Sequence, residues 1–393
     1  MKIQTLFLLL LFIIAGCQSN DRQSNTEGIP IIDLSKNHPE KKIILQDIAD
    51  VEYVPLETTD DVLLSQLSIL SYVSDKYIII HDLMQYNIYV FSRNGKIISY
   101  LNRKGQGPQE YVSISGPGVI FDEKNEEIFV LNFPSYRFLV YSIYGEYKRT
   151  LHYSENLRGI FAHNFNDEAL LIYNNDRLVL TENYSETPFL LISKKDGSVI
   201  SNINIRLPIR YSNRTVVPFE SGGQVWTTAD YIPTRYNWFD GEDFILSDIS
   251  SDTIYRITKL RNLTPILVRN PSVQSSDPPI VWSTLLTTDK FIILQKTILD
   301  FVSNKEYETL IYEFNTGKTS KVSFVNADLG GQEFHLYVIG VGVDVPKNMH
   351  AAVIYTKYMK NYYEEKQKKG ELRGDEKIPD EEDNPFVMIV KFK

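Results

Sequence analysis

The stretch "IYVFSRNGKIISYL", Ile88–Leu101, holds two short apolar runs joined by an Asn-Gly pair. Each run has the length of a strand, and Asn-Gly favours a type I′ hairpin turn, because both turn residues then adopt positive φ. The stretch therefore predicts two antiparallel strands that meet at Asn94 and Gly95. A further run of strand length, "DKYIIIHD" (Asp75–Asp82), precedes it and begins in the same way, with polar turn residues.

The same arrangement recurs along the chain. Comparable runs are "NEEIFVLN" (Asn125–Asn132), "NDEALLIYN" (Asn166–Asn174), "GEDFILSD" (Gly241–Asp248) and "TDKFIILQ" (Thr288–Gln295). The glycines of the following turns, Gly95, Gly145, Gly197 and Gly317, are 50, 52 and 120 residues apart. The last gap fits two repeats, of which Asp252–Leu267 is the one without a glycine. A period near 50 residues, with four short strands in each unit, is typical of a β-propeller.

This period predicts an all-β chain in which residues 29–393 form one six-bladed β-propeller with four-stranded antiparallel blades. We expect Ile29–Leu34 or Lys41–Ile48 to close the ring by pairing beside Asn384–Lys393. The charged segment Thr356–Asp383 departs from the pattern. It predicts a helix over Thr356–Lys369 and then a mobile acidic loop, together a solvated excursion between two strands of the last blade.

The N-terminus predicts export and a lipid anchor. Lys2 and the apolar run Leu6–Ala15 have the form of a secretory signal, and the run is too short to span a bilayer as a helix. Ile14-Ala15-Gly16-Cys17 resembles the lipobox of bacterial lipoproteins, and Cys17 is the only cysteine among 393 residues. The resemblance implies that residues 1–16 are removed and that lipid on Cys17 holds the protein to a membrane. Residues 17–28 are polar and predict a flexible tether.

Charge and composition exclude one class of partner. The net charge of −9 argues against nucleic acid, which requires a basic face. A chain with one cysteine has no internal disulfide and depends on a large core, which a hydrophobic content of 43% can supply.

Four segments carry a resemblance to a known family. They are "VEYVPLETTDD" (Val51–Asp61), "RKGQGPQEY" (Arg103–Tyr111), "SDTIYRI" (Ser251–Ile257) and "EEDNPFVMIVKFK" (Glu381–Lys393). With these segments the chain resembles the six-bladed β-propeller lipoproteins of Bacteroidota, which are related in architecture to NHL-repeat propellers. The resemblance implies this fold and a place in the cell envelope as an outer-membrane lipoprotein. It names no substrate and leaves open whether the protein faces the periplasm or the outside.

The glycine-rich stretch "NRKGQGPQEY" (Asn102–Tyr111) raises the question of a phosphate loop. A P-loop requires Gly-Lys-Ser/Thr before a helix, and a dinucleotide fingerprint requires a third glycine where Glu110 stands. The stretch instead predicts the crossing from one blade to the next, with Gly105 and Gly107 adopting unusual φ values and Pro108 stiffening the chain. No cofactor is expected.

No specific catalytic or metal-binding set emerges from the sequence. The six histidines are scattered without metal-ligand spacing, and "DEKNEE" (Asp122–Glu127) lacks the pattern of a calcium loop and predicts a solvated hairpin turn. His81 and Asp82 end a strand, where a hydrogen-bonded turn is the expected role.

Candidate ligand-binding residues are aromatic or basic and belong to the crossings and to the loops between second and third strands. We expect these loops to lie on one face of the ring, around the channel. Packing between blades is the alternative role of each aromatic residue. The candidates are Tyr86, Arg103, Lys104, Tyr136, Arg137, Arg235, Tyr236 and Trp238.

Three functions are consistent with these features. The first is a lipid-anchored, non-catalytic binding or scaffold module for an envelope protein, a peptide or a glycan. The second is an envelope enzyme of the lyase or glycoside hydrolase type with its site in the central channel. The third is a sensor or an accessory of an outer-membrane uptake system. A tight cluster of two carboxylates, or of a histidine with an acid, at the channel mouth favours the enzyme, whereas a broad aromatic and arginine surface without such a cluster favours binding.

Overall fold

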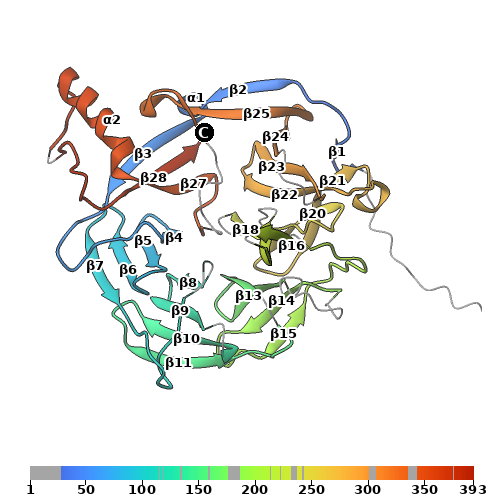
Figure 1. Cartoon of the computed structure of the whole chain (residues 1–393), viewed down its shortest axis with the longest axis horizontal. Helices are drawn as coiled ribbons and strands as arrows, with labels where there is room; N and C mark the ends of the chain where they lie inside the picture. Colours follow the sequence, from blue (N-terminus) through green and yellow to red (C-terminus); the bar gives the residue numbers. More distant parts are fainter. Residues whose placement is uncertain are drawn as a thin grey trace, which may run out of the picture.

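The computed structural model is a ring of six β-sheets around a central axis (Figure 1), which confirms the predicted six-bladed propeller with four-stranded antiparallel blades. The structure describes residues 28–114, 116, 118–132, 135–157, 160–175, 186–212, 214–221, 223–231, 237–240, 243–300, 307–334, 343–374 and 376–393. The predicted signal segment, Cys17 and most of the predicted tether lie outside these ranges.

The first three blades follow one another along the chain, and each is an antiparallel meander. Blade 1 consists of β4 (Ser68–Val73), β5 (Tyr77–Asp82), β6 (Ile88–Ser92) and β7 (Ile97–Leu101). Blade 2 consists of β8 (Val119–Asp122), β9 (Glu127–Asn132), β10 (Arg137–Ser142) and β11 (Tyr147–His152). Blade 3 consists of β12 (Ile160–Asn164), β13 (Ala169–Asn174), β14 (Phe189–Ser193) and β15 (Val199–Asn202).

The other three blades complete the ring. Blade 4 consists of β18 (Asn237–Asp240), β19 (Asp243–Leu246), β20 (Thr253–Thr258) and β21 (Leu263–Asn270). Blade 5 consists of β22 (Ile280–Thr287), β23 (Phe291–Ile298), β24 (Glu308–Glu313) and β25 (Lys318–Asn326), with β26 (Gln332–Phe334) beside β25. Among the described residues blade 6 has three strands, in the order β27 (Met349–Ile354), β28 (Phe386–Phe392) and β3 (Ala49–Pro55). Short 3₁₀ helices follow β21 and β25, at η3 (Val273–Ser275) and η4 (Ala327–Leu329).

Ring closure uses the N-terminus, as predicted, but a different segment of it. The strand that pairs with β28 is β3, whereas β1 (Ile31–Asp33) and β2 (Glu40–Ile44) add in parallel to the outer strands of blades 4 and 5. The prediction that one of those two segments pairs beside the C-terminal strand is therefore wrong. After the short helix α1 (Leu45–Ile48), β3 is the first segment long enough to pair along the whole of β28. The three strands form a belt around half of the ring (Figure 1).

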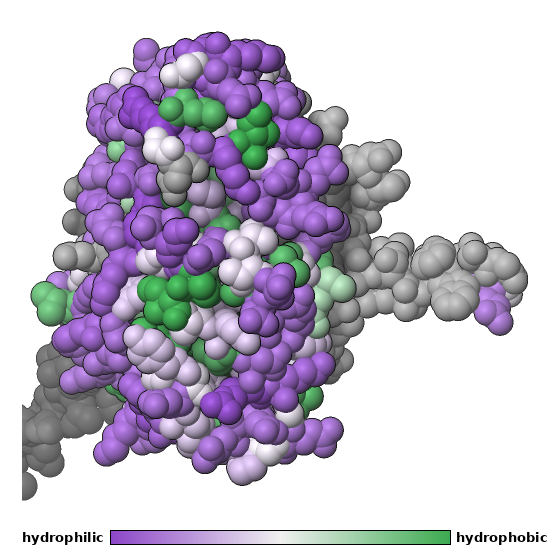
Figure 2. All heavy atoms as spheres, turned by 90° about the vertical axis from the view of Figure 1, so that its left-hand side faces the viewer, coloured by the Kyte–Doolittle hydropathy of each residue, from purple (hydrophilic) through white to green (hydrophobic). Residues whose placement is uncertain are grey.

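The middle strands of the blades are buried on both sides, because each blade packs face to face against its neighbours. Every residue of β5, β9 and β13 is buried, which explains why these strands are continuous aliphatic runs rather than alternating ones. The outer strand β7 alternates instead, and it exposes Ile98 and Tyr100. The rim on this side is mainly polar, with apolar patches between the polar residues (Figure 2).

The predicted turn glycines join neighbouring blades. Gly95, Gly145 and Gly197 all have φ between +81° and +86°. Each turn also reaches the end of the outermost strand of the preceding blade. A Cβ on Gly95 would lie 2.0 Å from the carbonyl oxygen of Pro55, and one on Gly197 would lie 2.4 Å from that of His152. Both the backbone conformation and the close approach therefore require glycine here.

The helix α2 (Thr356–Lys369) has the predicted bounds, but it is more than a solvated excursion. Met359 and Tyr363 are buried in the largest core cluster, and Tyr363 stacks near Phe386 of β28 with ring centroids 5.5 Å apart. The segment after the helix is held in place as well, since Lys366 bonds Glu376 at 2.6 Å. An apolar stripe on the charged helix thus docks it on blade 6.

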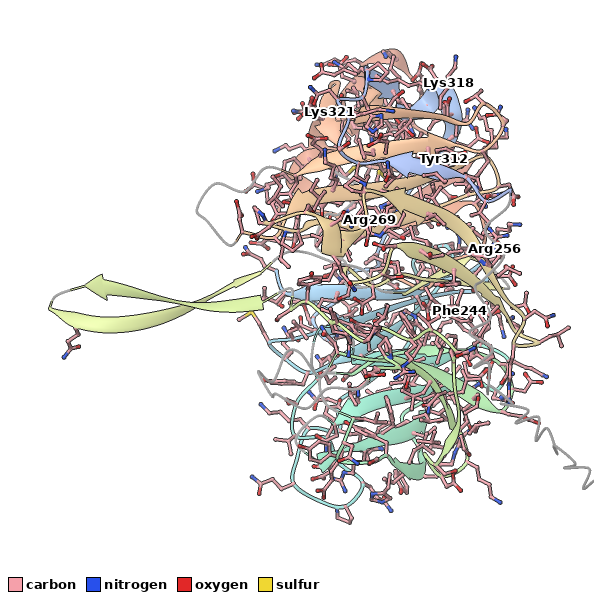
Figure 3. The ribbon with its side chains drawn as sticks, turned by 90° about the vertical axis from the view of Figure 1, so that its right-hand side faces the viewer. Phe244, Arg256, Arg269, Tyr312, Lys318 and Lys321 are labelled. Carbon is pink, nitrogen blue, oxygen red and sulfur yellow. The ribbon has the colours of Figure 1, made fainter. Side chains whose placement is uncertain are left out.

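A long hairpin stands out from the ring between blades 3 and 4. It consists of β16 (Arg214–Ser221) and β17 (Gln224–Tyr231), which pair over eight residues each. Figure 3 shows this two-stranded ribbon projecting away from the body of the molecule. It explains why the fourth repeat is longer than the others.

Candidate functional site

The ring has two faces, which we name by their connections. The loop face carries the blade crossings and the loops between second and third strands. The turn face carries the turns between first and second strands, which surround the channel. Because successive strands of a blade are antiparallel, these two sets of connections lie at opposite ends of the inner strands. The hairpin of β16 and β17 belongs to a crossing and therefore to the loop face.

The stretch Asn102–Tyr111 forms the predicted crossing between blades 1 and 2. Its two ends lie side by side, since Tyr111 N donates to Arg103 O and Gly105 N to Tyr111 O, both at 3.0 Å. The Tyr111 hydroxyl is buried in the crossing and donates to Tyr86 O at 2.8 Å. Burial raises the pKa of Tyr111 to about 12, so this hydroxyl stays protonated as a donor. The crossing is a rigid loop rather than a phosphate cradle.

The two glycines of this crossing have a different role from the predicted one. Neither Gly105 nor Gly107 has a φ in the left-handed region. Instead the carboxylate of Glu110 folds over them and accepts from Gly107 N at 2.8 Å. A Cβ on Gly105 would lie 1.9 Å from this carboxylate. The prediction of unusual φ values is wrong because space for Glu110, and not backbone conformation, excludes a side chain.

Two predicted residues meet on the loop face. The Lys104 ammonium lies 4.1 Å from the centroid of the Tyr86 ring, a cation–π contact between the crossing and the β5–β6 loop. Met84 of the same loop is 61% exposed, and Leu67 beside it is 54% exposed. The backbone of Leu83 joins them by donating to Leu67 O at 3.2 Å. We call Leu67, Met84, Tyr86 and Lys104 the loop-face patch.

The predicted residues of blade 2 make contacts within the protein. Arg103 spans to that blade and donates through Nε and Nη2 to Gly145 O, at 3.1 and 2.9 Å. Arg137 donates to Glu110 O at 3.3 Å, and the ring of Tyr136 packs edge-on against Tyr153. Three of the eight candidates, Arg103, Tyr136 and Arg137, thus make contacts that hold the blades and crossings together.

The last three candidates belong to the enlarged fourth repeat. Arg235 and Tyr236 lie outside the described residues. For Trp238 the structure gives only its place in β18, opposite Ile245.

The channel mouth on the turn face holds a cavity of about 700 Å³. The ends of the inner strands β4, β8 and β12 form its wall, together with a segment that precedes β27. That segment lies in the channel, where Asp344 exchanges backbone hydrogen bonds of 3.0 Å with Ser71 and Val73 of blade 1. The lining includes Tyr72, Glu123, Lys124, Asn164, Asp167, Lys259 and Asp344.

A histidine and an acid meet across this channel. His163 Nδ1 of blade 3 lies 2.6 Å from Asp344 Oδ1, and both side chains are buried, with 9% and 11% of their surface exposed. No sequence signal indicates this pair, because its members are 181 residues apart and neither belongs to a motif. The predicted His81 lies elsewhere, buried against Ser71 Oγ at 2.7 Å.

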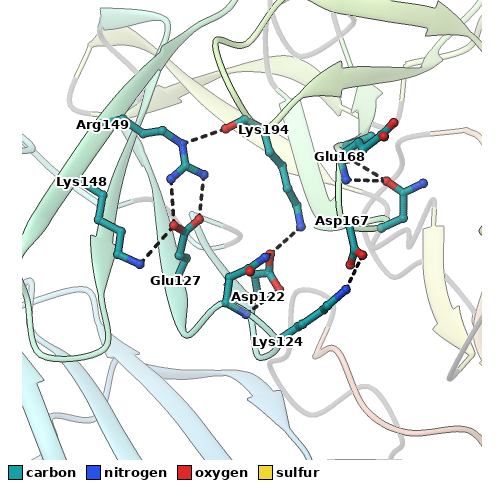
Figure 4. Close-up of polar contacts among 11 residues, drawn as sticks. Asp122, Lys124, Glu127, Lys148, Arg149, Asp167, Glu168 and Lys194 are labelled. Carbon is teal, nitrogen blue, oxygen red and sulfur yellow. Dashed lines mark hydrogen bonds and ion pairs between the residues drawn. The ribbon is translucent and has the colours of Figure 1, made fainter.

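Next to the cavity, blades 2 and 3 share a buried ionic cluster (Figure 4). Lys194 bonds Asp122 at 2.7 Å, and Arg149 binds Glu127 with two bonds of 2.8 and 2.7 Å. Burial alone raises the pKa of both acids, but the hydrogen bonds from these cations outweigh it and hold the pKa below the ordinary value. The turn Asp122–Glu127 was predicted to be solvated, but its two ends are buried, and each has a counter-charge: Lys194 of blade 3 for Asp122, and Arg149 of blade 2 for Glu127.

The described residues contain no group of three or more histidine, cysteine, aspartate or glutamate residues arranged to hold a metal ion. Their helices include none with the length and apolar character needed to cross a membrane.

Comparison with known proteins supports the fold. A crystal structure of a protein described as exported, from Bacteroides fragilis NCTC 9343, matches with a TM-score of 0.57 and 17% identity, over 92% of this chain and 99% of the other. A member of the DUF4221 family from Bacteroides vulgatus ATCC 8482 has a TM-score of 0.43 and 11% identity, over 72% and 90% of the two chains. No curated protein matches the sequence. The model of a domain of unknown function, DUF4934, covers residues 29–391, and the chain belongs to this family.

Proposed function

We propose that this propeller is a non-catalytic binding module of the cell envelope that docks a protein or peptide on its loop face. The observation that carries the proposal is the loop-face patch. It combines two exposed apolar side chains, Leu67 and Met84, with the ring of Tyr86, which is in cation–π contact with Lys104. An exposed apolar group with an aromatic and a cationic neighbour is typical of a protein interface and favours a protein over a glycan.

The envelope address is part of the same proposal. The lipobox-like sequence before Cys17 and the fold shared with a protein described as exported support it. Lipid on Cys17 would hold the ring to a membrane through the tether of residues 17–28. A Cys17→Ser variant should then appear in the soluble fraction of the cell, whereas the unchanged protein stays with the membranes.

The docking role is tested by cross-linking in envelope extract, with the captured partner identified by mass spectrometry. The double change Leu67→Ser, Met84→Ser should abolish capture of that partner. Leu260→Ser is the matched control, because Leu260 is 83% exposed but lies in the β20–β21 turn, away from the loop face. Equal capture by all three proteins would rule out the loop-face patch as the docking surface.

An enzyme acting in the channel is a second candidate, favoured by the His163–Asp344 pair. An acid that orients a histidine is the arrangement of a general base. Incubation with envelope glycans and peptides, followed by mass spectrometry, tests this role. A product that disappears with His163→Gln and persists with Lys104→Ala would favour the enzyme over the binding module.

A further inference from the structure

The cavity at the channel mouth forms a second site on the opposite face from the loop-face patch. From its surplus of uncompensated acceptors and its aromatic wall, we propose that it binds an organic cation, the arginine or lysine side chain of a peptide. The site does not depend on docking at the loop face, since the two lie at opposite ends of the inner strands.

Three oxygen acceptors of the cavity lack full partners among the described residues. Asn164 Oδ1 is buried and accepts no hydrogen bond. Glu123 accepts one, from the Tyr72 hydroxyl at 3.0 Å, and is in no ion pair. Asp344 bonds only His163 among the side chains of the described residues, through Oδ1. Unsatisfied acceptors in a partly buried site are costly, so a ligand that brings donors is favoured there.

The cations nearest to these acceptors are already neutralised. Lys124 bonds Asp167, and Lys76 bonds Glu126 at 2.9 Å. Asp122, which also lines the cavity, is paired with Lys194. The charges left over are the carboxylate of Glu123, the carboxylate of Asp344, whose partner His163 carries charge only when protonated, and Lys259, which is exposed and has no ion pair with a described residue. The excess is negative within the cavity, which favours a cationic ligand.

The wall beside these carboxylates is aromatic. Tyr72 lines the cavity and packs edge-on against Phe121, with ring centroids 5.1 Å apart. A tyrosine ring next to a carboxylate suits a guanidinium or an alkylammonium, because the cation meets the ring face and the acid together. Burial raises the pKa of Tyr72, and the charge of Glu123 adds to this, so the hydroxyl stays protonated and keeps Glu123 in position.

The site is built by contacts that exist without ligand. His163 fixes Asp344, and the backbone bonds of Asp344 to blade 1 fix its main chain. A cavity of about 700 Å³ lies within the usual range for small ligands and holds a side chain with adjoining peptide.

The test is isothermal titration of the purified protein with the peptide acetyl-Gly-Arg-Gly-amide. The neutral isostere with citrulline in place of arginine, and the sugar maltose, are the comparison ligands. We expect the arginine peptide alone to bind, and Glu123→Gln to weaken it about tenfold or more, because one charged partner is lost. Lys259→Ala should tighten binding, since it removes a like charge. Lys104→Ala, on the loop face, should leave it unchanged.

Several results would overturn the proposal. They are no binding of the arginine peptide, equal binding of the citrulline peptide, and binding of maltose that Glu123→Gln weakens, which would mark a site for neutral sugars. Thermal unfolding of Glu123→Gln, a partly exposed and isosteric change, checks that the ring is intact. Because the loop-face patch is tested by Leu67 and Met84 variants, failure of either proposal leaves the other open to its own test.

Discussion

Replacing Asp122 by asparagine should destabilise the propeller strongly. The Asp122 and Lys194 side chains are only 3% and 6% exposed and bond at 2.7 Å, so the change leaves a buried ammonium without its counter-charge. Removing one partner of a buried ion pair costs about 3–5 kcal/mol. Asparagine keeps an oxygen for the bond from Asn125 Nδ2, so we expect a loss of about 3 kcal/mol, at the low end of that range.

Equilibrium unfolding in urea measures this loss, with an unchanged slope as evidence that the unfolded state is the same. Lys194→Met alone should cost a similar amount, because it leaves the carboxylate of Asp122 buried and unpaired. The double change should cost much less than the sum of the two, since no charge is then left uncompensated.

An exposed pair between the same two blades provides the matched control. Lys124 and Asp167 are 69% and 66% exposed, so Asp167→Asn should leave the urea midpoint unchanged within error. Strictly additive losses, or a loss below about 1 kcal/mol for either buried single change, would refute the role given to burial.

Three further outcomes follow from the structure. Gly197→Ala should lower the unfolding temperature more than Gly223→Ala, because both have positive φ but only Gly197 lacks space for a Cβ. Met359→Ala should cost about 2–5 kcal/mol in urea unfolding and make α2 sensitive to protease, since Met359 is fully buried. The lowered pKa values of Asp122 and Glu127 add stability that is present above about pH 4 and lost as the pH falls through their folded values. In acid titrations the free energy of unfolding of Asp122→Asn should therefore fall less steeply with decreasing pH than that of the unchanged protein.

Local signals explain which parts of the fold were predictable. The turn at Gly95 needs positive φ and a short connection, and residues next to each other in the sequence indicate both. The belt was not predictable in the same way. β1 is three residues long and pairs in parallel with β21, more than 200 residues away, so no turn residue marks the pairing. Parallel partners of this kind are set by the finished ring and not by the sequence around them.

The residues of the channel-mouth cavity also come from distant parts of the sequence, but three of them share a place in the repeat. Tyr72, Asp122 and Asn164 lie at or next to the turn-face ends of the inner strands β4, β8 and β12, so the same part of each repeat supplies them. Once the repeat is aligned, the sequence alone indicates that these residues converge at the channel. The aromatic and basic candidates predicted from the sequence lie instead in the loops of the loop face. Asp344 differs, since only the closure of the ring brings its segment against blade 1.

The two faces differ in how their residues are used, and this difference bears on function. On the loop face, Arg103 and Arg137 satisfy backbone carbonyls between strands and crossings, so the charge there serves the fold and leaves an apolar surface available. On the turn face, the ions of blades 2 and 3 neutralise one another, while Glu123 has no ion pair with a described residue and Asp344 is bonded only to His163, next to a cavity. An exposed apolar patch suits a macromolecular partner, and a small charged cavity suits a single side chain. Under the two proposals, the propeller binds a folded partner on its loop face and the arginine or lysine side chain of a peptide on its turn face.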